Sequence, residues 1–329
     1  MPAVTADTLT LPRLPELPEA GTAWRGVRRI IQARKFLEGE GFQVRRPFPG
    51  VDLSLADPFL LLDHMGAVEY GPGEAKGAPW HPHRGFETVT YIIDGAFEHT
   101  DSIGGGGLIT DGATQWMTAG AGILHNEMPP QDMIAKGGLF HGVQLWVNLP
   151  KALKMVQPRY QDIKARDAKL LSSADGGALV RVIAGTLAGH DGPGVTYSPI
   201  TYLHATVSPG ARLAMPWPED FNAMVYVLSG RGTIAEEGRP LEEGQLGVFG
   251  PGSALTMRAA AGQPGNSAAG WEILVLGGLP INEPISRYGP FVMNTRQEIV
   301  QAMEDFQAGR LGQIPAEHLA HRSSADEKL

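Results

Sequence analysis

The sequence predicts an all-β protein made of two successive antiparallel β-barrels and one helix after them. Short runs of β-branched and aromatic residues recur along the chain, and 43 glycines and 26 prolines among 329 residues supply turns between them. No long helical period interrupts residues 25–150. The same order of strands and turns then returns in the second half, which indicates an internal repeat.

The overall composition excludes several classes of protein. The absence of cysteine rules out disulfides and thiolate ligands, so that a metal site must use histidine, carboxylate or water. A net charge of -8 argues against direct binding to nucleic acid. The start of the chain lacks a basic-then-apolar leader, and no apolar run is long enough to span a bilayer. The sequence therefore predicts a cytoplasmic protein without membrane contact.

The first half begins with a proline-rich arm. Residues 1–24 are predicted to be flexible, because the prolines in residues 11–18 lack an amide donor and fix φ; docking along a barrel edge is the alternative. Residues 25–160 are predicted to form the first domain. Its expected strands are residues 41–46, 59–64, 88–93, 96–101 and 143–148, and the glycine run 104–107 is expected at a hairpin tip.

The second half repeats part of this pattern. After a predicted connector at residues 151–190, residues 161–290 are assigned to a second domain, with strands at 223–230, 244–250 and 271–276. This copy has no His-x-His pair before its strand and no His-x-Glu pair after its later turn. It is therefore expected to bind no metal.

Residues 291–329 are predicted to form a helix and a tail. Thr295 and Glu298 have the spacing of a capping box, and Gly309 is a plausible stop. Ile299, Met303 and Phe306 then share one face. The two histidines in the tail, His318 and His321, are expected to be solvated.

Four side chains predict a metal site in the first domain. His81 and His83 are two residues apart, as are His125 and Glu127, and residues i and i+2 of a strand point to the same face. Two such strands facing each other inside a barrel would bring three imidazoles and a carboxylate to one point. Glu87 has the same parity as His81 and His83, so the residues alone leave it as a fifth candidate.

Five segments of the chain resemble the pirin family of the cupin superfamily. They are residues 57–65, 81–89, 115–120, 144–150 and 289–294, and the resemblance extends from about residue 25 to residue 308. It implies a bicupin, that is, two stacked antiparallel β-barrels of the double-stranded β-helix or jelly-roll type, with metal only in the N-terminal barrel. The chain departs from the general cupin pattern at Thr118-Ala119-Gly120, where Pro-x-Gly is usual, and in the later position of His125.

The resemblance also implies the identity of the ligands. In pirins the carboxylate ligand lies two residues after the last histidine, which selects Glu127 and releases Glu87 to orient Arg84 or a ligand imidazole. The implied metal is Fe²⁺, although manganese, nickel, copper and zinc remain open. The implied ligand set is His81, His83, His125 and Glu127.

Two functions follow from the resemblance. The first is a dioxygenase that opens a flavonol such as quercetin with O₂ and releases CO, with Glu127 as the base that takes the 3-hydroxyl proton. The second is a non-enzymatic, redox-responsive iron protein that regulates through a protein partner. A deep apolar pocket that admits a flat ring favours the first function.

Other aromatic and histidine residues receive weaker predictions. Trp80, Phe86, Trp116 and Met117 either line the pocket or belong to the core. His64, His99 and His141 are predicted to be hydrogen-bonded structural residues.

Overall fold

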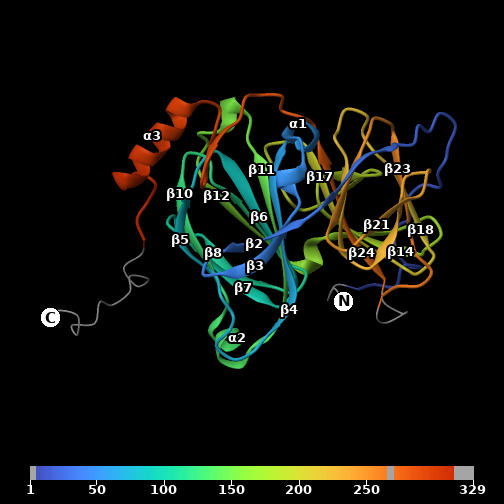
Figure 1. Cartoon of the computed structure of the whole chain (residues 1–329), viewed down its shortest axis with the longest axis horizontal. Coiled ribbons are helices and arrows are strands. Elements are labelled where there is room, and N and C mark those ends of the chain that lie inside the picture. The colour runs from blue at the N-terminus through green and yellow to red at the C-terminus, as the bar shows by residue number, and fades with distance from the viewer. Residues whose placement is uncertain (1–4, 265–269, 315–329) are drawn as a thin grey trace.

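The computed structural model describes residues 5–264 and 270–314 and shows two similar β units side by side, with one longer helix at the C-terminal side (Figure 1). Each unit contains a seven-stranded and a four-stranded antiparallel sheet. The predicted all-β fold with an internal repeat and a C-terminal helix is confirmed. Within the described ranges, no helix is both long and apolar enough to cross a bilayer.

The first unit consists of eleven strands in two sheets. Its seven-stranded sheet has the order β12 (Arg159–Ile163), β9 (Thr114–Thr118), β6 (Phe86–Asp94), β11 (Gly138–Asn148), β4 (Phe59–Tyr70), β3 (Phe42–Arg46) and β2 (Arg34–Glu38). Its four-stranded sheet has the order β5 (Ala78–His83), β10 (Ile123–Met128), β7 (Ala96–Asp101) and β8 (Gly106–Thr110).

The second unit repeats this arrangement. Its seven-stranded sheet has the order β1 (Val27–Gln32), β22 (Gln245–Phe249), β19 (Met224–Ser229), β24 (Trp271–Gly278), β17 (Ile200–Val207), β14 (Ala178–Ala184) and β13 (Lys169–Ser172). Its four-stranded sheet has the order β18 (Arg212–Pro216), β23 (Ala254–Ala259), β20 (Arg231–Ile234) and β21 (Arg239–Glu242).

Shorter elements connect the sheets. They are η1 (Phe48–Gly50), α1 (Leu53–Ala56), α2 (Gln131–Lys136), η2 (Lys151–Leu153), η3 (Ala165–Asp167), the pairs β15 (Thr186–Leu187) with β16 (His190–Asp191) and β25 (Ser286–Tyr288) with β26 (Phe291–Met293), and the terminal helix α3 (Arg296–Gln307).

The edge strand of the second unit comes from the beginning of the chain. Strand β1 pairs antiparallel with β22, and it occupies the edge position that β12 occupies in the first unit. Residues 27–32, which the sequence placed in the first domain, therefore hydrogen-bond within the second unit. Apolar contacts on both faces favour this position, since Ile31 packs between the units and Ile30 against the core of the second unit.

Two stretches without clear strand patterns in the sequence are well ordered by tertiary contacts. The arm was predicted to be flexible, but Leu14 is buried in the core of the second unit, and its amide donates to the Ser172 carbonyl at 2.8 Å. The predicted connector at residues 151–190 contains β12, β13 and β14. Strand β12 was missed because it is largely polar, and β13 because it has four residues. Strand β14 has an apolar run interrupted only by Arg181, a strand signal that the assignment to a connector overlooked.

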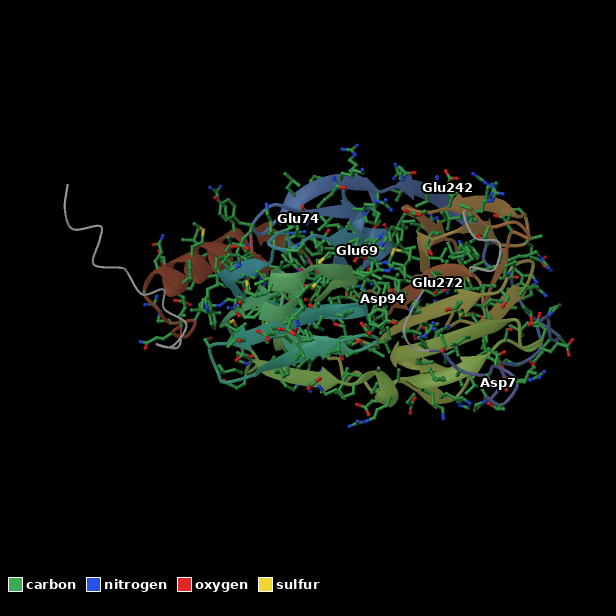
Figure 2. All side chains as sticks on the ribbon, turned by 90° about the horizontal axis from the view of Figure 1, so that it is seen from below. Asp7, Glu69, Glu74, Asp94, Glu242 and Glu272 are labelled. Atoms are coloured by element: carbon green, nitrogen blue, oxygen red, sulfur yellow. The ribbon has the colours of Figure 1, made fainter. Side chains whose placement is uncertain are left out.

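The two seven-stranded sheets pack against each other through a shared apolar core. Two buried hydrogen bonds cross this interface: His64 bonds to Tyr226 at 3.1 Å, and Tyr91 bonds to His204 at 2.7 Å. Within the first unit, His64 also bonds to His141 at 2.8 Å. His64 and His141 are thus hydrogen-bonded structural residues, as predicted. Asp94 of the first unit and Glu272 of the second lie where the units meet (Figure 2).

After the second unit, the chain returns to the first. The residues from Pro280 to Met293, here called the return segment, contribute Val292 to a cluster with Phe86 and Trp146. Helix α3 follows, and it packs against β10 and β26. Its predicted capping box is confirmed, because Thr295 accepts from the Glu298 amide and Glu298 accepts from the Thr295 amide.

The predicted apolar face of α3 is only partly buried. Ile299 and Ala302 are buried and Met303 packs against the cluster, whereas Phe306 is 42% exposed. The tail histidines His318 and His321 lie outside the described residues.

Candidate metal centre and its cavity

The four predicted ligands come from two adjacent strands of the four-stranded sheet. Strands β5 and β10 pair antiparallel, and their register sets His125 opposite His81 and Ile123 opposite His83. The alternation of side chains along each strand therefore directs the four candidates to one face. The sequence anticipated two strands facing each other; the structure instead makes them hydrogen-bonded neighbours.

Three imidazoles converge in this place. The ligand nitrogens of His81, His83 and His125 all lie within 4.8 Å of one another, and the Nε2 atoms of His81 and His125 are 2.9 Å apart. A second group within the same distance contains His125, Glu127 and His99. The two groups share His125, so the structure gathers all four predicted ligands around it.

Backbone carbonyls fix the protonation of two imidazoles. The Nδ1 of His81 donates to the Pro79 carbonyl at 2.7 Å, and the Nδ1 of His83 donates to the Pro290 carbonyl at 3.3 Å. A neutral imidazole with its proton on Nδ1 has a free lone pair on Nε2. Burial, reinforced by the other imidazoles, lowers the pKa of His83 and His125 well below the ordinary value, which keeps both neutral.

This donor set fits a divalent metal ion. Metal–nitrogen bonds of about 2.0–2.1 Å at a right angle would place two ligand nitrogens about 3 Å apart. The separation of 2.9 Å between the Nε2 atoms of His81 and His125 has this size. Unprotonated nitrogens at such a distance repel each other unless a cation or a shared proton lies between them.

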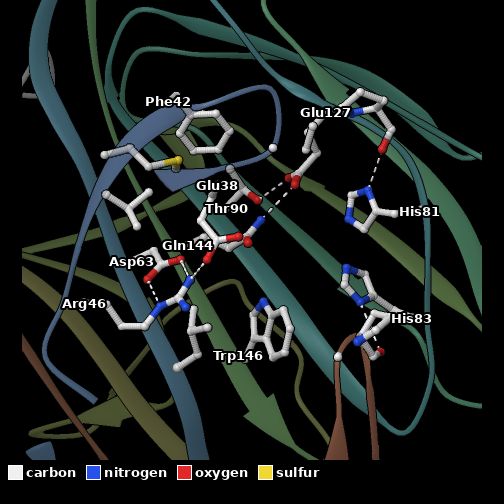
Figure 3. Close-up of a pocket in the computed structure, with 18 of the residues that line it drawn as sticks. Glu38, Phe42, Arg46, Asp63, His81, His83, Thr90, Glu127, Gln144 and Trp146 are labelled. Carbon is white, nitrogen blue, oxygen red and sulfur yellow. Dashed lines mark hydrogen bonds and ion pairs between the residues drawn. The ribbon is translucent and has the colours of Figure 1, made fainter. Parts of the chain in front are cut away.

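The Glu127 carboxylate is held by two side chains of the opposite sheet. Thr90 Oγ1 donates to one carboxylate oxygen at 2.6 Å, and Gln144 Nε2 donates to the other at 2.8 Å (Figure 3). Thr90 and Gln144 are direct partners in the ladder between β6 and β11, so they face the same way. In the sequence, Thr90 and Gln144 are polar residues at strand positions that face the interior. A polar side chain buried at such a position needs a hydrogen-bond partner.

A second buried group lies behind His125. His99 Nδ1 is 3.3 Å from His125 Nδ1, and the Gln115 amide donates to the same His99 nitrogen at 2.6 Å. The other His99 nitrogen lies 3.5 Å from Asp101, and Tyr160 stacks on the His99 ring. His99 was predicted to be structural; it is so, and it also contacts a candidate ligand.

The interior of the first unit is polar at this level. One row crosses β9, β6, β11 and β4 in register through Gln115, Thr90, Gln144 and Asp63, and Asp63 continues it to Arg46 by a hydrogen bond of 2.6 Å. This row lies across the interior from Glu127 and His99.

The interior of the second unit is apolar. A register row across the corresponding strands runs through Gly247, Val225, Val275, Leu203 and Val182. Strands β18 and β23, which take the places of β5 and β10, bury four side chains without an imidazole or a carboxylate, namely Leu213, Met215, Leu255 and Met257. Among the described residues, the candidate metal groups all belong to the first unit.

A cavity of about 570 Å³ opens onto His81, His83 and Glu127. This volume lies within the range of about 300–1,000 Å³ that is typical of small-molecule sites. Its walls are largely apolar, and the return segment closes one side with Arg287, Gly289 and Pro290. The apolar and aromatic lining residues are Phe42, Val44, Leu61, Met65, Trp80, Phe97 and Trp146.

The predicted aromatic neighbours have different positions. Trp80 lines the cavity. Phe86 lies behind its wall, with its ring centre 5.1 Å from that of His83. Trp116 belongs to the core between the units, and Met117 packs in a small separate cluster.

Glu87 and Arg84 do not contact the imidazoles through their side chains. Glu87 accepts hydrogen bonds from Thr118 at 2.7 Å and Thr196 at 2.9 Å, and burial raises its pKa despite these bonds. Arg84 donates to Asp305 of α3 at 2.7 Å and to the Ala121 carbonyl at 2.6 Å. Neither side chain lines the cavity.

The turn that follows His83 is locked from two sides. Gly85 has φ +89°, and a Cβ at this position would lie 2.0 Å from the Val292 carbonyl, so only glycine fits. Lys154 Nζ donates to the carbonyls of Gly85 and Val292 and to Asn148 Oδ1 at 2.8–2.9 Å. Burial lowers the pKa of Lys154 to about 8.

Comparisons with known proteins agree with this geometry. The family model described as Pirin matches residues 41–147, and the model described as Pirin C-terminal cupin domain matches residues 202–312. A pirin-like protein of Solanum lycopersicum is 40% identical over 88% of this chain and 93% of its own length. Pirin of Rattus norvegicus is 37% identical over 86% of this chain and 92% of its own length.

A solved structure is similar throughout. The crystal structure of quercetin 2,3-dioxygenase from Acinetobacter baumannii matches with a TM-score of 0.82 and 38% sequence identity. The match covers 89% of this chain and 100% of that chain.

Proposed function

The chain belongs to the pirin family, and from this premise we propose that it is an iron-dependent dioxygenase that cleaves a flavonol such as quercetin with O₂ and releases CO. The observation that carries the proposal is a ring-sized, largely apolar cavity that opens onto His81, His83 and Glu127, with His125 buried directly behind them. The similarity to a quercetin 2,3-dioxygenase structure supports the choice of substrate.

The residues that would hold the ion are the four that the sequence singled out, His81, His83, His125 and Glu127. When bound, Fe²⁺ would supply Lewis-acid and redox chemistry, which acidifies a substrate hydroxyl and activates O₂. The geometry of the imidazoles suits this ion because the Pro79 and Pro290 carbonyls hold the Nδ1 protons of His81 and His83, which leaves Nε2 as the nitrogen that can bind it.

The protein side of the reaction is the binding and deprotonation of the flavonol. The apolar walls of the cavity exclude water and bury the flat rings. Glu127 takes the proton of the 3-hydroxyl group, while Thr90 and Gln144 hold the two oxygens of the carboxylate in place. The heterocycle then opens and CO leaves.

The test is oxygen uptake with detection of CO. The protein is reconstituted anaerobically with Fe²⁺, quercetin and O₂ are added, and His83→Ala serves as the control. We expect CO release that depends on iron and falls to background in the variant. No uptake by fully metallated protein would refute the dioxygenase and favour the non-enzymatic, partner-binding role.

A second variant tests the role of Glu127. Glu127→Gln keeps the shape of the side chain but removes its ability to accept a proton. We expect the variant to retain part of its iron, measured by metal analysis, and to lose turnover. Full activity of the iron-loaded variant would exclude Glu127 as the base.

A further inference from the structure

The cavity presents hydrogen-bond donors that the protein itself does not use. Each carboxylate in its lining already has a donor: Glu127 has Thr90 and Gln144, and Arg46 donates to both Asp63 and Glu38. Every carboxylate in the lining thus already accepts a hydrogen bond from the protein. The lining therefore does not favour a cationic or hydroxyl-rich ligand.

Trp146 is the first unused donor. Its side chain lines the cavity, and its indole Nε1, which is buried within the wall, has no acceptor among the described residues. Buried indole N–H groups normally find a partner, so this one calls for an acceptor from a ligand.

Arg287 of the return segment is the second side chain with unused hydrogen-bond donors. Its guanidinium carbon lies 4.8 Å from the Trp146 ring centre, and its hydrogen bond to the Leu60 carbonyl is long, at 3.4 Å. Within the part of the chain that the structure describes, it pairs with no carboxylate. Desolvation and the nearby Arg46 charge lower the pKa of Arg287, although Asp63 and Glu38 act in the opposite direction, and a bound anion would add to the effect of these carboxylates.

The two donors lie next to the candidate metal centre. The His83 ring contacts the same indole, with ring centres 5.4 Å apart at 74°. Trp146 thus borders both His83 and Arg287, and a ligand of about one aromatic ring can reach from one to the other along it.

From these contacts we infer that the cavity takes an aromatic acid: its carboxylate accepts from Arg287 and from Trp146 Nε1, and its far oxygen atoms point to the imidazoles. The inference deepens the proposed function and rests on it for the metal end of the ligand. Quercetin, which has no carboxylate, would then be a surrogate for the natural substrate.

The experiment compares two probes of nearly equal size and shape, of which one carries a carboxylate and the other a neutral amide. 3,4-Dihydroxybenzoate and 3,4-dihydroxybenzamide share the ring and the hydroxyl groups, and at pH 7 only the first is an anion. Their dissociation constants are measured by calorimetry and by quenching of tryptophan fluorescence. Both the Fe²⁺-loaded protein, under anaerobic conditions, and the metal-free protein are used.

We expect the wild-type protein to prefer the acid by roughly tenfold or more, as is typical of a charge-assisted pair. Arg287→Gln should reduce the ratio of the two dissociation constants, amide over acid, toward one and leave the affinity for the amide unchanged. Arg287→Lys should restore part of the preference for the acid. Arg239→Gln, the same substitution at an exposed arginine of the second unit, should change neither value. Because Arg287 is exposed at the rim, loss of folding is not expected, and thermal unfolding checks this.

A ratio near one in the wild-type protein, or an unchanged ratio in Arg287→Gln, would overturn the inference. This outcome is separable from failure of the dioxygenase proposal, because binding needs no turnover. CO release from quercetin without a preference for the acid would refute the aromatic acid alone. A preference for the acid without any oxygen uptake would refute the dioxygenase alone.

Discussion

Thr90 and Gln144 decide whether Glu127 is ready to bind an ion. A carboxylate that is already oriented loses less freedom on binding, which is why residues that bond to metal ligands strongly affect affinity. Each of the two residues holds one oxygen of Glu127. Both belong to the seven-stranded sheet, whereas Glu127 belongs to the four-stranded sheet, so the contact also joins the two sheets.

We therefore predict that Thr90→Val and Gln144→Leu each weaken metal binding by roughly 10–100-fold. The measurement is a competitive titration of the metal-free protein with Fe²⁺ under anaerobic conditions. Thr88→Val is the matched control, because Thr88 is on the same strand and buried, and its Oγ1 has no hydrogen-bond partner among the described residues. Equal affinities of Thr90→Val and Thr88→Val would show that Thr90 does not hold the carboxylate for the ion.

Lys154 should make the free energy of unfolding rise as the pH increases from about 8 to about 10. Its pKa is about 8 in the folded protein and about 10.5 in the unfolded chain, so between these values the unfolded chain binds more protons. Raising the pH from 8 to 10 then favours the folded state. Removing the side chain abolishes this gain and also leaves three acceptors without their donor.

For Lys154→Met we predict a loss of about 1–3 kcal/mol in the free energy of unfolding at pH 7. The gap to the wild-type protein should widen by on the order of 2 kcal/mol as the pH rises to 10. Urea unfolding at pH 7, 8, 9 and 10 measures both. The buried tyrosines affect wild type and variant alike and cancel in the difference, so a gap that stays constant would contradict the assignment.

At the scale of elements, the spacing of residues along the chain predicted which side chains share a face of a strand. It did not predict which strands pair around the candidate site. The i, i+2 spacing of His81 with His83 and of His125 with Glu127 sets a common face in any strand. The pairing of β5 with β10 depends on the whole sheet, and no local pattern specifies it. Thr90 and Gln144 carried a weak signal, whereas the approach of Pro290 to His83 joins segments far apart in sequence.

Helix α3 was predicted from local signals because its cap is local. Thr295 and Glu298 are three residues apart and bond to each other's amides. We predict that Thr295→Ala lowers the free energy of unfolding by about 1 kcal/mol, while Thr295→Ser retains most of it. Urea unfolding compares the three proteins, and equal midpoints for the alanine and serine variants would show that the cap does not contribute.

The edge strands show where sequence reasoning fails. Strand β1 resembles any short amphipathic strand, and nothing within Val27–Gln32 states that its partner is β22. Strand β12 occupies the equivalent edge of the first unit, although it follows that unit's other strands in the chain. The predicted domain limits at residues 25 and 160 assumed that neighbours in sequence pair with each other, which is common but not required.

At the scale of the whole molecule, the interface between the units should be sensitive to acid. His204 bonds to Tyr91 of the other unit and to Glu272, and burial, with the charge of Arg181 as a smaller cause, lowers its pKa to about 4. Burial also lowers the pKa of His64 well below its ordinary value. The unfolded chain therefore binds protons first as the pH falls below about 6.5.

Because the pKa of His204 is lowered in the folded protein, its contribution to the free energy of unfolding is fully present above pH 6.5. This contribution decreases as the pH falls toward 4. We predict that His204 alone accounts for a loss on the order of 3 kcal/mol across this range. The gap between wild type and His204→Gln in urea unfolding should narrow by this amount between pH 7 and pH 4. A gap that is independent of pH would contradict a neutral His204 in the folded protein.

The position of β1 has a consequence for the synthesis of the protein. A nascent chain leaves the ribosome at roughly 5–20 residues per second, so β1 waits on the order of ten seconds or longer for β22. During this time the backbone of Val27–Gln32 lacks the strand with which it pairs, and Ile30 lacks the core of the second unit. The wall formed by Arg287 and Pro290 is translated later still, so a newly made centre stays open to metal ions from solution until nearly the whole described chain has emerged.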